Sequence, residues 1–138
     1  MYLEGRGVKL DQVKGIELLD LAASKGYSVS QFNLAVRYRY GNGVKKDPLR
    51  AVSLFAKAAE QGDIIAQVNV GEMYLNGEGL EPDYEQAYSW LIGAAEEGHS
   101  TAMIYISEMY KRGLGVKKNQ RLAYEWEEQR RKCRNIFM

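Results

Sequence analysis

The sequence predicts an all-α protein: a right-handed α/α superhelix (solenoid) of antiparallel helix pairs with a 36-residue repeat. Two observations predict this fold class. Four Gly-x-Gly triplets follow one another at intervals of 36 residues, and the segments between them carry apolar residues at the three- and four-residue spacing of helices. The triplets begin at Gly5, Gly41, Gly77 and Gly113. Such a period is typical of proteins whose repeats stack on their neighbours.

Each triplet lies in a constant setting. A tyrosine stands three residues before it, and an acid or amide stands six residues after its first glycine. The tyrosines are Tyr2, Tyr38, Tyr74 and Tyr110, and the acids or amide are Asp11, Asp47, Asp83 and Asn119. Asp and Asn are preferred N-cap residues, so we expect each triplet to be a turn between two helices and each acid or amide to begin the second helix.

Every repeat therefore supplies two helices, which we name helix A, before the triplet, and helix B, after it. Asp47 followed by Pro48 is a typical start for a helix B, because the first helical position needs no N–H. Gly26, Gly62 and Gly98 are expected to end the helices B with positive φ. We interpret Trp90 and Trp126, at equivalent positions of helix B, as core residues.

One position inside helix A is always small. It holds Ala35, Gly71 and Ser107 in successive repeats. A glycine inside a helix costs about 1 kcal/mol relative to alanine, so we expect small size to be required there. We predict that helices A and B cross closely at this point, with the Ala94-Ala95 pair of helix B opposite.

The two ends depart from the pattern. We expect one domain, 1–138, with a partial repeat 1–27 and repeats 28–63, 64–99 and 100–135. Residues 1–4 keep only the last turn of a helix A, so a first helix B from about residue 12 to 25 lacks its partner, and its apolar surface predicts self-association through this open N-terminal face. Near the C-terminus, Arg130, Arg131, Lys132 and Arg134 are typical of a solvated capping helix; the alternative is an anion-binding patch.

Composition narrows the classes of function. The chain has 19 Lys and Arg against 18 Asp and Glu, a net charge of +1, so no strong positive field attracts nucleic acid or a membrane surface. No apolar run approaches the ~20 residues of a membrane helix, and residues 1–25 contain no signal-peptide pattern. We expect a protein or peptide partner, no nucleic acid and no membrane. The compartment stays open: the cytoplasm is slightly favoured, and a periplasmic or secreted location requires an upstream signal.

The residues offer little for catalysis. Cys133 is the only cysteine and His99 the only histidine, so neither a Cys–His pair nor a metal site of several such ligands is predicted. His99 follows Gly98 where a helix A begins, and we interpret it as a helix-start residue. We therefore predict a protein that is not an enzyme, with no catalytic residue, no cofactor and no metal.

The repeat resembles the Sel-one-like repeat (SLR), a longer relative of the tetratricopeptide repeat. The resemblance is carried by the residues from Ala66 through Gly71, Tyr74, Gly77 and Gly79 to Trp90, Ala94-Ala95 and Gly98, and it covers nearly the whole chain. It implies a superhelix whose helices A line a concave face and bind peptides and proteins, as an adaptor or scaffold. Many members of the family are bacterial. The alternative function is a dedicated inhibitor or immunity protein that binds a bacterial effector enzyme.

The binding surface is expected on the part of each helix A that does not face helix B. The predicted partner-binding residues are Phe32, Asn33, Val36, Arg39, Val68, Asn69, Glu72, Leu75, Ile104, Tyr105, Glu108 and Lys111. This lining is apolar in part and carries charges of both signs. For Asn33 and Asn69 two interpretations stay open: a carboxamide that binds the backbone of an extended peptide, or a hydrogen bond within the repeat.

Overall fold

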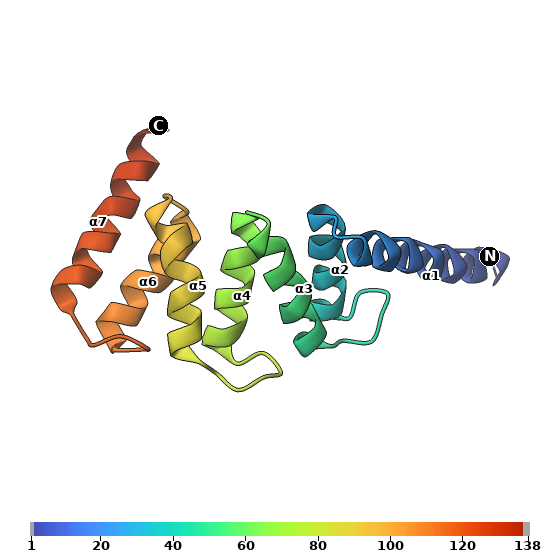
Figure 1. Ribbon diagram of the computed structural model, residues 1–138, viewed down its shortest axis with the longest axis horizontal. Coiled ribbons are helices and arrows are strands. Elements are labelled where there is room, and N and C mark those ends of the chain that lie inside the picture. Colours follow the sequence, from blue (N-terminus) through green and yellow to red (C-terminus); the bar gives the residue numbers. More distant parts are fainter. Residues whose placement is uncertain (1, 137–138) are drawn as a thin grey trace. The chain divides into compact units, whose positions relative to one another are not determined.

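The computed structural model describes the backbone of residues 2–136 and the side chains of residues 12–132. Within residues 2–136 the elements are helices joined by turns, with no strand (Figure 1). The helices are α1 (Tyr2–Ser24), α2 (Ser28–Tyr40), α3 (Pro48–Glu60), α4 (Ile64–Asn76), α5 (Tyr84–Glu96), α6 (Ser100–Arg112) and α7 (Gln120–Ile136). The chain forms two compact units, Met1–Ala66 (unit 1) and Gln67–Met138 (unit 2).

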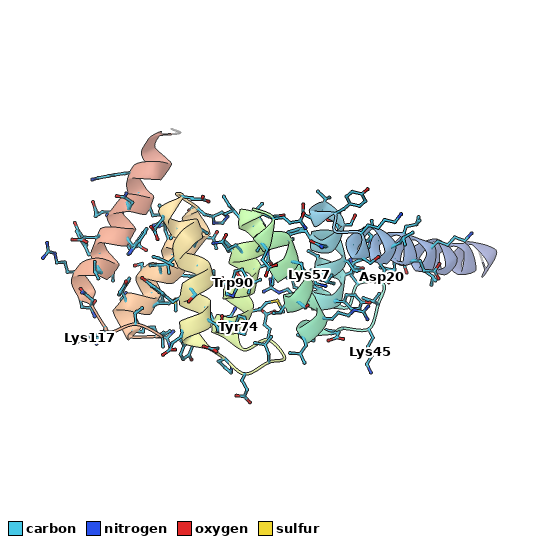
Figure 2. The ribbon with its side chains drawn as sticks, viewed as in Figure 1. Asp20, Lys45, Lys57, Tyr74, Trp90 and Lys117 are labelled. Atoms are coloured by element: carbon cyan, nitrogen blue, oxygen red, sulfur yellow. The ribbon has the colours of Figure 1, made fainter. Side chains whose placement is uncertain are left out.

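The three later helices B begin as predicted. Asp47, Asp83 and Asn119 each accept a hydrogen bond, through a side-chain oxygen, from the backbone N–H three residues further along, at 3.0–3.2 Å. This bond satisfies one of the N–H groups that a helix start leaves without an intrahelical acceptor. In Figure 2, Lys45 and Lys117 mark two of the loops that lead into these caps.

The Gly-x-Gly triplets after α2 and α6 form the predicted turns. Gly41 and Gly113 adopt the left-handed conformation, with φ of 69° and 72°, and end their helices. The loop then folds back, because the N–H of Asp47 donates to the carbonyl of Tyr38 at 2.8 Å, and the N–H of Asn119 donates to the carbonyl of Tyr110 at 2.8 Å. The tyrosine of each repeat therefore supplies the acceptor that closes the loop.

Unit 1 is built on helices α1, α2 and α3. The largest fully buried side chains are Leu34 of α2 and Phe55 of α3, and the ring of Phe55 meets that of Phe32 edge to face at 5.4 Å. A chain of amides ties the turns together: Gln61 Nε2 donates to Gln31 Oε1 at 2.9 Å, and Gln31 Nε2 donates to the carbonyl of Ala23 at 3.3 Å. These bonds satisfy the polar atoms of Gln31, which is buried.

Unit 2 has its core between α4, α5, α6 and α7. Leu91, Ile106 and Met109 are fully buried there. The close crossing predicted at Gly71 is confirmed, but the residue opposite is Leu91 and not the Ala94-Ala95 pair. A Cβ atom placed on Gly71 would lie 2.4 Å from Leu91 Cγ. The leucine side chain fills the space that the missing Cβ leaves, so a larger residue at position 71 would require Leu91 to move.

The N-terminal turn that we predicted at Gly5-Arg6-Gly7 is wrong. The backbone is helical through these residues, and α1 runs unbroken from Tyr2 to Ser24 (Figure 1). In later repeats the turn is closed by bonds to the tyrosine carbonyl of a complete helix A, whereas only four residues of this sequence precede the first triplet. The triplet alone therefore does not set a turn, and the bond to the tyrosine carbonyl is needed to close it. The side chains of Tyr2 and Asp11 lie outside the described residues.

Trp90 and Trp126 are half-buried, so the prediction that both are core residues is only partly right. The fully buried position of helix B is the next one along, occupied by Phe55 and Leu91. At half-buried positions an indole covers the core with one face and meets solvent with the other.

Replacing Gly71 with alanine should destabilise the protein by about 1–3 kcal/mol, because the new methyl group overlaps Leu91 by more than side-chain adjustment can relieve. Urea denaturation followed by circular dichroism measures this change.

Gly15→Ala is the matched control, since Gly15 also lies inside a helix and no atom among the described residues comes within 4 Å of its added Cβ. That variant should unfold at an equal or higher urea concentration, because alanine raises the free energy of unfolding by up to about 1 kcal/mol. Equal losses in the two variants would contradict the close crossing.

Candidate functional site

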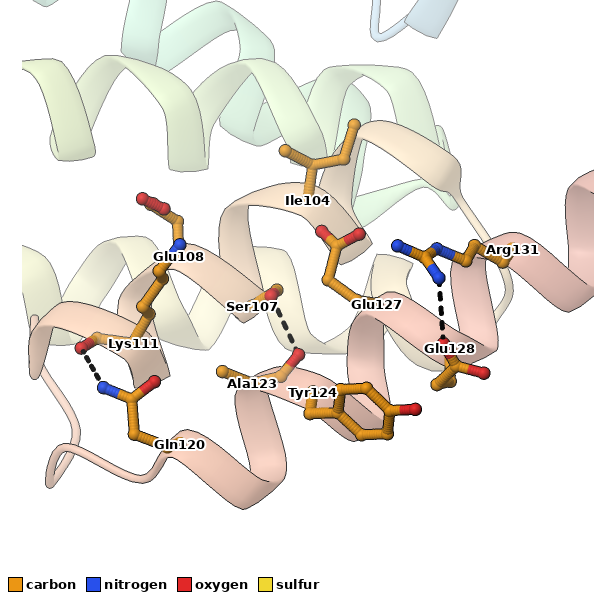
Figure 3. Close-up of a pocket in the computed structure, with 10 residues that line it drawn as sticks. All are labelled: Ile104, Ser107, Glu108, Lys111, Gln120, Ala123, Tyr124, Glu127, Glu128 and Arg131. Carbon is orange, nitrogen blue, oxygen red and sulfur yellow. Dashed lines mark hydrogen bonds and ion pairs between the residues drawn. The ribbon is translucent and has the colours of Figure 1, made fainter.

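Helices α6 and α7 of unit 2 border an open groove of about 290 Å³ (Figure 3). We call it the α6–α7 groove. Helix α6 contributes Ile104, Ser107, Glu108 and Lys111, and helix α7 contributes Gln120, Ala123, Tyr124, Glu127, Glu128 and Arg131.

Caps and one short contact place these two helices. His99 begins α6, as predicted, and its Nδ1 accepts the N–H of Ala102 at 3.4 Å. Ser107 occupies the small position of helix A, and its hydroxyl donates to the carbonyl of Ala123 at 2.9 Å (Figure 3). Because both residues are small and buried, the helix backbones approach closely at the floor of the groove, and longer side chains on either side form its walls.

The walls combine an aromatic and an aliphatic surface with charges. Ile104 is 44% exposed and Tyr124 is 65% exposed, so both offer apolar area to a partner. Glu108 and Lys111 lie along α6, and Arg131 of α7 donates to Glu128 at 3.3 Å (Figure 3). The groove therefore suits a ligand with an apolar anchor and polar groups around it, which is typical of a protein surface.

Three of the predicted partner-binding residues line this groove: Ile104, Glu108 and Lys111. The prediction missed α7, because we treated that helix only as a polar cap. A signal was present in the repeat: Tyr124 stands 36 residues after Tyr88 and is much more exposed than a core residue of helix B should be.

The predicted residues of α4 have mostly structural contacts. The hydroxyl of Tyr105 on α6 donates to Glu72 Oε2 at 2.5 Å, so two predicted binding residues bind each other. Asn69 is half-buried and has an interaction within the protein, while Leu75 is half-buried. Val68 is only 6% exposed, so its side chain forms no part of an accessible surface.

In unit 1 some of the predicted binding residues are accessible and one is buried. Asn33 is exposed, and Phe32 and Val36 are half-buried. Arg39 is only 4% exposed, with its guanidinium 5.2 Å from the ring centroid of Tyr40. Its aliphatic stem and planar head pack against neighbouring groups, so Arg39 also leaves the predicted binding surface.

The basic cluster of α7 is compensated within the helix. Arg130 donates to Glu127 at 3.1 Å, and Arg131 donates to Glu128 at 3.3 Å, while Lys132 is exposed. Arg134 lies outside the residues whose side chains are described. Two of the four cations already have a carboxylate partner, which favours the solvated cap over the anion-binding patch.

A tyrosine pair joins α5 to α6. The hydroxyl oxygens of Tyr88 and Tyr110 lie 2.7 Å apart, and their rings meet edge to face with centroids 5.9 Å apart. Burial, followed by the hydrogen bond to Tyr110, raises the pKa of Tyr88 well above its usual value. Tyr88 therefore holds its phenol proton, and with it the hydrogen bond to Tyr110, to higher pH than an ordinary tyrosine does.

The N-terminal helix exposes apolar side chains, as the sequence predicts. Leu18 is 67% exposed, and Val13 and Leu21 are also more than half exposed. Among the described residues no helix is long and apolar enough to cross a bilayer. Within the same part of the chain, no three His, Cys, Asp or Glu side chains are placed to hold a metal ion together.

The sequence profile of the Sel1 (Sel-one-like) repeat matches residues 1–27, 28–63, 64–99 and 100–127. No curated protein sequence matches the chain significantly.

Three solved structures have similar backbones. One is c5321 of uropathogenic Escherichia coli, a protective antigen with an SLR fold: its TM-score is 0.81 and its identity 34% over 91% of this chain and 29% of its own. A Sel1 repeat protein of Oxalobacter formigenes has a TM-score of 0.80 and 29% identity over 87% of this chain and 35% of its own. Cysteine-rich protein B of Helicobacter pylori shares the fold. Its TM-score is 0.65 and its identity 19%, over 91% of this chain and 90% of its own.

These likenesses confirm the predicted all-α repeat solenoid. This chain spans only about a third of the length of the first two proteins.

Replacing Tyr105 with phenylalanine should destabilise the protein by about 1–2 kcal/mol, because the hydrogen bond to the Glu72 carboxylate between α6 and α4 is lost. Urea denaturation checks the value. Tyr124→Phe is the control: its side chain is largely exposed, and the free energy of unfolding should change by less than about 0.5 kcal/mol. If the two variants unfold alike, the Tyr105 hydroxyl does not hold the helices together.

Proposed function

Because this chain belongs to the Sel1 repeat family, whose helical repeats mediate protein–protein interaction, we propose that it is an adaptor or scaffold that binds a protein segment in the α6–α7 groove. The observation that carries the proposal is the groove itself, an open surface between two helices on part of the face predicted from the sequence.

The lining has the composition of a recognition surface. Tyrosine is one of the residues most enriched in the small group that dominates binding energy, and Tyr124 stands exposed on one wall. Ile104 on the other wall can bury its side chain against the same ligand. Glu108 and Lys111 can then orient polar groups of the partner, because charges at the rim give specificity more than affinity.

The dimensions suit a few side chains of a macromolecule. A groove of about 290 Å³ lies at the lower end of the range for small-molecule sites, which usually enclose most of their ligand. This groove is instead an open one, lined by residues of α6 and α7 (Figure 3). Sel1 repeat proteins are typically not enzymes, and His99, the only histidine, is used as a helix cap.

A pull-down from a lysate of the source organism tests the proposal. The immobilised wild-type chain should retain a protein that the triple variant Ile104→Ala, Glu108→Ala, Tyr124→Ala retains at least tenfold less, since loss of a central aromatic anchor alone costs about 1 kcal/mol or more. Quantitative mass spectrometry of the bound fraction measures the ratio.

A second triple variant, Tyr27→Ala, Glu60→Ala, Ile65→Ala, removes the same three residue types from exposed positions outside the groove and should retain the protein as wild type does. Equal retention by wild type and the groove variant would refute the groove as the binding site. Short synthetic segments of a retained protein then separate an adaptor, which binds them, from an inhibitor, which needs the folded target.

Self-association through α1 stays a prediction. Sedimentation velocity at increasing protein concentration should show a dimer or larger species for wild type, and Leu18→Glu should shift the protein to monomer, because a charge in the contact must be desolvated. Leu49→Glu on α3 is the control, since Leu49 is exposed to a similar extent. A wild-type chain that stays monomeric throughout shows that α1 is not a contact between copies.

A further inference from the structure

The α6–α7 groove has a counterpart one repeat earlier, within the same compact unit. Shifting its residues back by 36 positions leads to the surface formed by α4 and α5. Glu108 then corresponds to Glu72, Tyr124 to Tyr88, and Ile104 to Val68.

This earlier surface is occupied, and its occupant is α6. Helix α6 is held there by two tyrosine hydroxyls five residues apart. Tyr105 donates to the Glu72 carboxylate of α4. Tyr110 shares a 2.7 Å hydrogen bond with Tyr88 of α5, with the two rings edge to face.

The equivalent side chains are more exposed in the α6–α7 groove, where the described residues place no helix in the position that α6 takes on α4 and α5. Val68 is 6% exposed in the occupied surface, whereas Ile104 is 44% exposed in the groove. Tyr88 is half-buried, whereas Tyr124 is 65% exposed. The groove thus keeps the shape of a helix-binding surface and, among the described residues, has no helix on it.

The two side chains that bind α6 on the earlier surface have equivalents in the α6–α7 groove. The carboxylate of Glu72 recurs as Glu108, and the phenol of Tyr88 recurs as Tyr124. Both belong to the groove lining (Figure 3). A helix with hydroxyl donors at the spacing of Tyr105 and Tyr110 therefore meets the same acceptor and the same ring.

One part of the lining has changed from apolar to charged. Leu91, Ile92 and Ala95 of α5 are replaced on α7 by Glu127, Glu128 and Arg131. A permanently covered surface keeps its apolar residues, as Leu91 and Ala95 do at full burial. Charged residues at these places keep an empty groove soluble and require polar side chains on whatever binds beside them, so the occupant is a helix that binds and leaves.

We propose, building on the protein-binding role of this groove, that it receives an amphipathic α-helix of a partner protein in the position that α6 takes on α4 and α5. The helix presents one tyrosine hydroxyl to Glu108 and a second tyrosine, five residues further along, to Tyr124. Polar residues beside them face Glu127, Glu128 and Arg131.

The test uses the one helix already shown to fit such a surface. The probe is a fluorescein-labelled peptide with the sequence of Ser100–Arg112, cross-linked through positions 104 and 108. These positions line the α6–α7 groove, so they point away from α4 and α5, and the cross-link is needed because an isolated helix of this length is marginal in water.

Fluorescence anisotropy should show saturable binding to the wild-type chain. Glu108→Ala and Tyr124→Ala should each weaken the affinity about tenfold, the effect of losing a hydrogen bond to a charged group or an aromatic anchor. A second peptide with both tyrosines changed to phenylalanine should bind wild type about tenfold more weakly and lose little more with Glu108→Ala, which locates the contact without relying on the protein variants alone.

Glu125→Ala is the control variant, because Glu125 lies on α7 outside the groove and pairs with Arg121. It should bind both peptides as wild type does. Variants are compared only if their urea unfolding midpoints match.

Other outcomes overturn the proposal. If Glu108→Ala and Tyr124→Ala leave the affinity for the peptide unchanged, the peptide replaces α6 within the chain and does not bind the groove. A wild-type dimer that these variants abolish would make a second copy the occupant. If the peptide does not bind but a protein is still retained from the lysate through the groove, a helical ligand is excluded and the proposed function stands. If the peptide does not bind and no protein is retained through the groove, the proposed function is refuted too.

Discussion

The structure depends on the close approach of helix A to helix B at one small residue in each repeat. Gly71 leaves room for the Leu91 side chain, and Ser107 is small enough to donate its hydroxyl to the Ala123 carbonyl. A larger residue would push the helices apart and lengthen every contact on either side. The spacing sets which side chains of neighbouring helices can meet, so the Tyr88–Tyr110 and Tyr105–Glu72 contacts depend on it.

A repeated backbone makes one surface serve two purposes. On α4 and α5 the surface is covered by α6, and most of its residues are apolar. On α6 and α7 the same surface is an open groove with charged residues in place of four apolar ones: Lys111, Glu127, Glu128 and Arg131 replace Leu75, Leu91, Ile92 and Ala95. A solenoid thus needs no new architecture for a binding site, only substitutions where a repeat has no helix beyond it among the described residues.

Much of the fold could be predicted from the sequence because its main signals are local. The caps at Asp47, Asp83 and Asn119 and the turns at Gly41 and Gly113 depend on residues within a few positions, and the structure confirms them. The predicted turn at residues 5–7 is wrong because the triplet alone does not set a turn: the closing bond to a tyrosine carbonyl is also needed, and the local pattern does not report that bond.

The candidate site was less predictable. Helical spacing alone placed Val68 and Arg39 on an accessible face, but it cannot show what the neighbouring helix covers. The α7 wall of the groove follows from the repeat register, in which Tyr124 is the exposed equivalent of Tyr88.

The charged residues Glu127, Glu128 and Arg131 also bear on assembly. A solenoid whose last surface matched its internal ones could bind the first helices of another copy, and head-to-tail contacts of this kind do not close on themselves but grow into filaments. Two carboxylates and a guanidinium at this surface make such stacking costly, since each must lose its hydration against an apolar helix. The same substitutions that keep the groove soluble therefore oppose polymer growth through this surface.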